Sequence, residues 1–252
     1  MRIRPDVFLA ATNTLYAALI SNLLLVVGCA PLVVGLLITD PGKSWPLLAL
    51  AAPLGAPAFV GVFAVMASLS GPGIWKPDAD GRTRSIAAVR TFGRAWRASL
   101  RRATTLGALA TAALVIFGVD IAWAWGRTVG AVAIPVLVTL MILVVATTVL
   151  SLVALAERPA ARLRDVLRPA LYLAVRKWHF TIVSLGVLTL LLRIIAERPA
   201  IGFGFVAFPL LYIVWAGSRY SLRPLLDPPA PGATGQAQAA RSPMSRPAVS
   251  PA

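Results

Sequence analysis

Long apolar runs separated by short basic stretches dominate the chain. A helix needs about 20 apolar residues to cross the roughly 30 Å hydrocarbon core of a bilayer. We therefore expect an all-α fold, a polytopic transmembrane helical bundle of about six helices arranged as three hairpins. The expected spans are residues 16–38, 45–68, 103–125, 129–155, 180–196 and 201–216.

Several of these runs contain proline. In membranes, proline is tolerated inside a helix because neighbouring helices and side chains satisfy the backbone groups that it leaves unpaired. We therefore predict kinks rather than helix ends at these positions. The prolines concerned are Pro31, Pro53, Pro57, Pro135 and Pro209.

The end of the chain has a different composition. After Leu226 it is rich in Pro, Ala, Gly, Ser and Gln, and such a segment buries too little apolar surface to offset the entropy of ordering it. We divide the chain into a six-helix transmembrane domain, residues 1–226, and a disordered cytoplasmic tail, residues 227–252. The whole chain is 58% hydrophobic and 13% charged, whereas soluble domains have about 45–50% and about 25%.

The basic residues define an orientation. The formal net charge is +15. Loops that stay in the cytoplasm are enriched in Lys and Arg, and this retention explains the charge without a nucleic-acid partner. We expect a multi-pass protein of the cell (cytoplasmic) membrane with both termini in the cytoplasm. Of the 24 Lys and Arg residues, the external side receives only Lys43, Arg127, Arg193 and Arg198.

Residues 84–102 are amphipathic at helical spacing. The sequence predicts a basic interfacial helix, with its apolar side in the acyl boundary and its guanidinium groups at anionic lipid headgroups. A docking surface for a partner protein is the alternative. The apolar side carries Val89, Phe92, Trp96 and Leu100, and the basic side carries Arg90, Arg94, Arg97 and Arg101.

Two short patterns occur twice. Ala174-x-Arg176 precedes Ser184 with the spacing that separates Ala95-x-Arg97 from Thr105, which suggests a repeated unit of basic helix plus transmembrane hairpin. Ala-Glu-Arg-Pro-Ala occurs at 156–160 and at 196–200. Polar residues followed by proline are ordinary signals for the end of a helix, so we read the second pattern in that way.

Few polar residues fall within the spans. Asn22 is the candidate for a deep interhelical hydrogen bond. Asp120 and Arg193 lie near the outer ends of their spans, where they can reach the interface, and Arg193 can pair with Glu197 at i, i+4. A coupled carrier usually has carboxylates near the midplane, and the expected spans have none there.

The sequence offers no recognisable catalytic chemistry. Cys29 and His179 are the single cysteine and the single histidine, which excludes a disulfide framework or a zinc cluster. Phosphate-binding loops, dinucleotide fingerprints, metalloprotease motifs and serine-hydrolase motifs are missing. We therefore expect no catalytic residue, no metal and no cofactor.

Short motifs punctuated by Pro and Trp run through residues 7–225. Together they resemble the YesL-like family of bacterial integral membrane proteins, known as domain of unknown function 624. The resemblance implies an inner-membrane protein associated with carbohydrate uptake of the ABC type, and it supplies no binding residues. The motifs include Asn-Thr-Leu-Tyr at 13–16, Ser-Trp-Pro at 44–46, Gly-Ala-Pro-Ala at 55–58, Arg-Thr-Phe-Gly-Arg-Ala-Trp-Arg at 90–97 and Gly-Ser-Arg-Tyr at 217–220.

The resemblance and the missing chemistry favour a non-enzymatic accessory or assembly factor linked to carbohydrate ABC-type uptake. Its expected partners are the lipid bilayer, through anionic headgroups, and ABC-type sugar permease subunits. The alternative is a small transporter or channel in its own right.

The uneven distribution of Lys and Arg yields a prediction about topology. Reporter fusions after Lys43, Arg127 and Arg198 should report the external side, and fusions after Asp80 and Arg168 the cytoplasm, because basic loops are retained inside. Alkaline phosphatase and green fluorescent protein fusions would measure the two sides independently. An external location for Asp80 would overturn this orientation.

Overall fold

The computed structural model describes residues 5–40, 42–69, 81–158, 163–176, 178–198 and 201–226. Every regular element within these residues is a helix, which confirms the expected all-α class. Four of the described helices are long and apolar enough to cross a membrane, or five if one bent pair counts as a single span. This is the architecture of a multi-pass membrane protein. The predicted disordered tail lies outside the described residues.

The bent pair consists of α1 (Pro5–Gly28) and α2 (Ala30–Ile38), which lie at 74° to each other. The break falls at Cys29, and Pro31 occupies the first turn of α2, where a helix does not need the N–H group that proline lacks. We predicted a kink at Pro31, and the structure instead has a broken helix. Gly28 brings α1 against α3, because a Cβ on it would lie only 2.6 Å from Ala58 Cβ.

Three other prolines lie inside helices without ending them, as expected. Pro53 and Pro57 lie within α3 (Trp45–Leu69), and Pro135 lies within α5 (Gly130–Glu157), without ending either helix. Almost all residues from 55 to 66 of α3 are buried, so α3 forms the centre of the bundle.

α4 (Gly81–Ala124) is one continuous helix of 44 residues, about 66 Å long at 1.5 Å per residue. It joins residues 84–102, which we expected as a separate interfacial helix, to the expected span 103–125. No proline lies in α4, and Gly107, near the junction, packs against Pro53 of α3. Nothing in this stretch stops a helix, so the basic segment continues directly into the span.

The remaining described elements are α6 (Leu163–Arg176), α7 (Trp178–Glu197), the π-helical turn η1 (Gly202–Val206) and α9 (Ala207–Leu226). α5 and α7 both end at the glutamate of Ala-Glu-Arg-Pro-Ala. In each copy the backbone N–H of the arginine donates to the carbonyl four residues earlier. The pattern therefore marks helix ends, as predicted.

α7 covers the expected span 180–196, but it is not among the four or five candidate spans.

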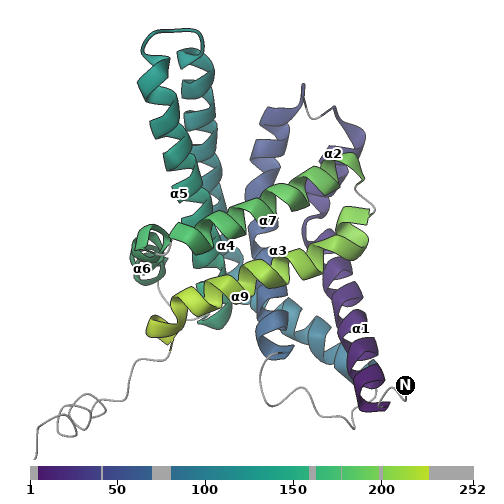
Figure 1. The fold of residues 1–252 in the computed structure, drawn as a ribbon. Helices are drawn as coiled ribbons and strands as arrows, with labels where there is room; N and C mark the ends of the chain where they lie inside the picture. Colours follow the sequence, from purple (N-terminus) through teal and green to yellow (C-terminus); the bar gives the residue numbers. More distant parts are fainter. Residues whose placement is uncertain are drawn as a thin grey trace, which may run out of the picture.

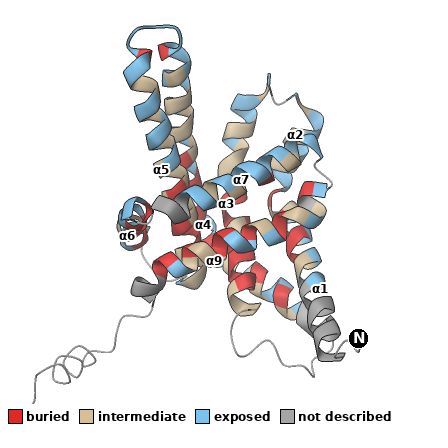
Figure 2. Cartoon of the chain, in the orientation of Figure 1, coloured by how far each residue is buried: buried red, intermediate tan, exposed pale blue. Residues whose placement is uncertain are grey.

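The helices are arranged in two groups that cross. α4 and α5 form a long antiparallel hairpin, and α7 and α9 lie side by side across it (Figure 1). Buried residues gather where α3, α4, α5 and α9 meet, whereas the upper half of the α4–α5 hairpin is largely exposed or half-buried (Figure 2). The third expected hairpin thus packs across the second instead of beside it.

The first half of α4 is fixed to α1 and α3 by the ring of Phe92. A Cβ on Gly61 of α3 would lie 2.6 Å from two atoms of this ring, and a Cβ on Gly28 of α1 would lie 3.3 Å from a third. The aromatic ring therefore occupies the space that side chains at these two glycines would need.

This contact predicts a selective loss of stability. Gly61→Ala should lower the Tm of the purified protein, because overpacking of this kind destabilises by about 1–3 kcal/mol. Gly118→Ala in α4 is the matched control: nothing lies within 4 Å of its Cβ position, and alanine in a helix is favoured over glycine by about 0.5–1 kcal/mol. Thermal unfolding in detergent would measure both variants. Equal Tm values would contradict the role assigned to Phe92.

Candidate functional site

The most strongly charged surface of the described chain lies on α4. Arg90, Arg94, Arg97 and Arg101 follow one another at intervals of three or four residues, so they lie on one side of the helix. All four are exposed. We call this set the arginine stripe. Within the described residues none of the four takes part in an ion pair, and α4 contains no acidic residue before Asp120.

The opposite side of α4 is occupied by the protein itself. Phe92 is 7% exposed and Trp96 is half-buried, whereas Val89 and Leu100 remain 47% and 37% exposed. Phe92 packs against α1 and α3, so part of the apolar side that we expected in the acyl boundary is used for helix packing. The other buried residues on this side are Ala88, Ser99 and Ala103.

Asn22 joins two irregular parts of the bundle. Its Nδ2 donates a hydrogen bond of 2.8 Å to the backbone carbonyl of Gly204 in η1, and the Asn22 residue is only 4% exposed. This is the kind of interhelical hydrogen bond that the sequence led us to expect. A π-turn disturbs the regular ladder of backbone hydrogen bonds, and a side-chain donor at one of its carbonyls helps to satisfy the backbone in an apolar environment.

The two charged residues predicted near the outer ends of spans do not form a common site. Asp120 is exposed on the last turns of α4, close in sequence to Trp123, whose ring lies 3.8 Å from the guanidinium carbon of Arg127. Arg193 pairs with Glu197 within α7 at 3.3 Å, and both side chains are largely exposed. An exposed pair of this kind contributes about 0.2–1 kcal/mol.

A more buried ion pair links α9 to α5, and the sequence analysis missed it. Arg219 Nε lies 3.4 Å from Glu157 Oε1, and the glutamate side chain is only 15% exposed. The guanidinium group also lies 5.2 Å from the centre of the Trp215 ring. The helical spacing of Trp215 and Arg219 is visible in the sequence, but no pattern in it points to Glu157, which lies 62 residues earlier.

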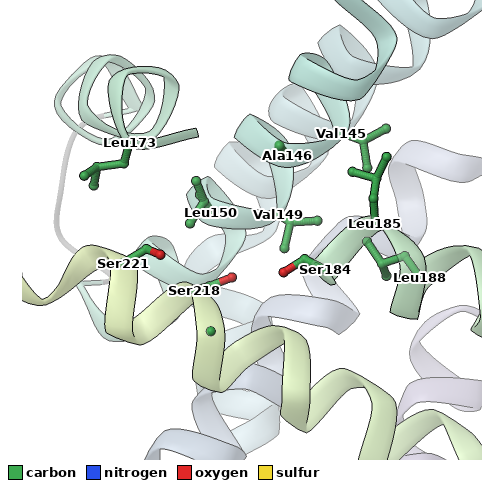
Figure 3. A pocket seen from close by; sticks show the side chains of 11 residues that line it. Val145, Ala146, Val149, Leu150, Leu173, Ser184, Leu185, Leu188, Ser218 and Ser221 are labelled. Carbon is green, nitrogen blue, oxygen red and sulfur yellow. The ribbon is translucent and has the colours of Figure 1, made fainter. Parts of the chain in front are cut away.

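A small cleft lies between α5, α6, α7 and α9; it is partly open to the outside, and its cavity volume is about 20 Å³. Its walls are apolar except for Ser184, Ser218 and Ser221. The hydroxyls of Ser184 and Ser218 point toward each other across it (Figure 3). Among the side chains that the structure describes, no charged residue lines the cleft. The cleft has room for a hydroxylic molecule such as water.

Metal ligands are also scarce. Within the described residues, no group of three or more His, Cys, Asp or Glu side chains could hold a metal ion. Cys29 is buried and free, with its Sγ 3.8 Å from the carbonyl oxygen of Gly55.

No protein-family model, no curated protein and no solved structure matches this chain. The resemblance to the YesL-like family therefore stays a prediction from the sequence motifs.

The contact of Asn22 with η1 yields a prediction about stability. Asn22→Leu should destabilise the protein by about 0.6 kcal/mol, the average for hydrogen bonds between membrane helices, and at most about 1.7 kcal/mol. Glu197→Gln is a suitable control because it breaks only the exposed pair with Arg193. Unfolding of both variants in mixed micelles would measure the difference. A leucine variant as stable as the control would show that the Gly204 carbonyl does not need this donor.

Proposed function

We propose that the chain is a non-enzymatic accessory or assembly factor of the cytoplasmic membrane, and that the arginine stripe of α4 is the surface through which it binds its partner. The observation that carries this proposal is the location of the stripe. Behind it, Phe92 packs on α1 and α3 and Trp96 is half-buried, so this part of α4 has less free apolar surface than an interfacial helix usually presents to lipid.

The length of α4 supports the same reading. Along the helix, Arg102 is 22 residues before Ala124, which is about 33 Å at 1.5 Å per residue and close to the roughly 30 Å hydrocarbon thickness. Arg101 therefore stands near one membrane surface when the α4–α5 turn stands at the other. The helix continues for a further 11 residues to Arg90, and this part extends past the hydrocarbon toward the cytoplasmic side assigned by the positive-inside rule.

Four guanidinium groups without acidic neighbours on their helix fit an acidic protein surface, because arginine forms paired hydrogen bonds with carboxylates. The resemblance to the YesL-like family suggests the identity of that partner. We propose the permease subunits of an ABC-type carbohydrate uptake system, contacted on the cytoplasmic side with both termini of this chain on the same side.

A small transporter is the second candidate, because one feature of the bundle favours it. The broken pair α1–α2 and the π-turn η1 are joined by the Asn22–Gly204 hydrogen bond, and discontinuous helices often form the substrate sites of transporters. One observation argues against a transporter. Of the carboxylates in the described ion pairs, Glu157 is the most buried; it lies at the end of α5 and is already paired with Arg219.

The experiment compares two variants of the arginine stripe in a strain that carries no other copy of the gene. Replacing all four arginines with Gln should weaken recovery of the permease with the tagged protein. At about 0.5 kcal/mol per exposed ion pair, four pairs amount to about 2 kcal/mol, roughly a 30-fold loss of affinity. Replacing them with Lys is the matched control, because it keeps the charge and the topology signal.

Uptake of labelled carbohydrate should fall with permease recovery in the Gln variant, and Asp120→Asn should leave both unchanged. Membrane levels and fusion-reporter topology need to be equal in all strains. Full permease recovery by the Gln variant would contradict the proposed surface. Carbohydrate flux through proteoliposomes containing only this protein would contradict the accessory role and support the transporter.

A further inference from the structure

α6 is a second basic amphipathic helix, and it is placed differently from the first half of α4. In Figure 1, α6 is seen end-on and α5 is seen lengthwise, so α6 lies across the side of α5. One side of α6 is buried against the bundle. The buried residues are Val166, Ala170, Leu173 and Ala174.

The outward side of α6 combines basic and apolar groups. Arg164, Arg168 and Arg176 are all exposed there, together with one acidic residue, Asp165. Three positive charges thus face one negative charge on this side. Leu171, Tyr172 and Val175 are 45%, 61% and 61% exposed. Part of the apolar surface of α6 is therefore not used for packing within the bundle. Arg176 Nη1 donates to the Tyr172 hydroxyl at 3.3 Å, which holds an arginine and an aromatic ring together at the surface.

The depth of α6 follows from its contact with α5. Leu173 lines the same cleft as Ala146 and Leu150, so α6 lies beside that part of α5. Leu150 is 20 residues after Gly130, or about 30 Å along the helix, which equals the thickness of the hydrocarbon core. Gly130 follows the α4–α5 turn, where Trp123, Trp125 and Arg127 gather.

Tryptophan and arginine at the turn are typical of a membrane interface. With that turn at one interface, α6 lies at the opposite one. A helix that lies across its neighbours at this depth, with arginines and exposed apolar side chains on its outer side, meets the requirements for binding a lipid surface.

We infer that α6 is the interfacial helix of this protein and binds anionic phospholipid headgroups. The guanidinium groups of Arg164, Arg168 and Arg176 contact the phosphates, and Leu171, Tyr172 and Val175 rest on the acyl boundary. This assigns the lipid contact to α6 instead of the arginine stripe. The inference does not depend on the accessory role, because a transporter would use the same anchor.

The test uses the full chain in detergent, titrated with phosphatidylglycerol or phosphatidylcholine and followed by native mass spectrometry. The wild-type protein should prefer phosphatidylglycerol. Replacing Arg164, Arg168 and Arg176 with Gln should reduce this preference roughly fivefold for each arginine that contacts a headgroup. The matched control replaces Arg90, Arg94 and Arg97 with Gln, which removes the same charge and should leave the preference intact.

A depth measurement gives an independent readout. In a Cys29→Ala background, a nitroxide placed at residue 175 should lie at the boundary of headgroups and acyl chains, and one placed at residue 94 should lie in water. The inference would be overturned if the α4 control lost its lipid preference and the α6 variant kept it. A nitroxide at residue 175 that lies in water would also overturn it. An α6 variant that keeps its lipid preference but no longer recovers the permease would make α6 a protein-docking surface and would overturn it too.

Discussion

The Phe92 ring determines how the rest of α4 faces its surroundings. It fills the space next to Gly28 of α1 and Gly61 of α3, where even a methyl group would be too close. An α-helix is a stiff rod, so fixing one side of it fixes the other side as well. The arginine stripe is therefore turned outward by two glycines that belong to other helices. Its availability to a partner depends on apolar contacts inside the bundle.

A second constraint concerns the backbone, which has to be satisfied wherever no water is present. The bundle departs from regular α-helix at Cys29 and again in η1. At the first break, the proline in α2 occupies a position where its missing N–H is harmless. At the second, Asn22 provides a donor from a helix 182 residues earlier in the chain. The first break is thus satisfied by local backbone bonds, and the second also receives one bond from a distant side chain.

The sequence was sufficient for features that depend on local chemistry. Hydropathy predicted the helical class, and Ala-Glu-Arg-Pro-Ala predicted the ends of α5 and α7. Helical spacing placed Arg90 to Arg101 on one side, and the i, i+4 rule paired Arg193 with Glu197. Each of these depends on residues within a few turns of one another.

Features that depend on packing were not predictable in this way. Lipid and protein interior are both apolar, so hydropathy cannot tell a side that faces lipid from one that faces another helix. This is why Phe92 was placed in the acyl boundary although it packs between α1 and α3. The pairing of Arg219 with Glu157 and the oblique crossing of α7 and α9 over the α4–α5 hairpin also bring distant segments together. Nothing in the local pattern specifies these contacts.

The two basic amphipathic helices show how one sequence pattern can support two roles. In the first unit of the suggested repeat, the basic segment and the following span form a single helix, α4. In the second unit, α6 ends at Arg176 and α7 begins at Trp178. A basic segment that continues into its span has to follow the path of that span out of the membrane, so its arginines reach progressively farther into water. A basic helix that ends before the next helix begins can lie across the bundle and keep all its arginines at one depth. Under the two proposals made above, continuity of the helix, more than its composition, separates a protein contact from a headgroup contact.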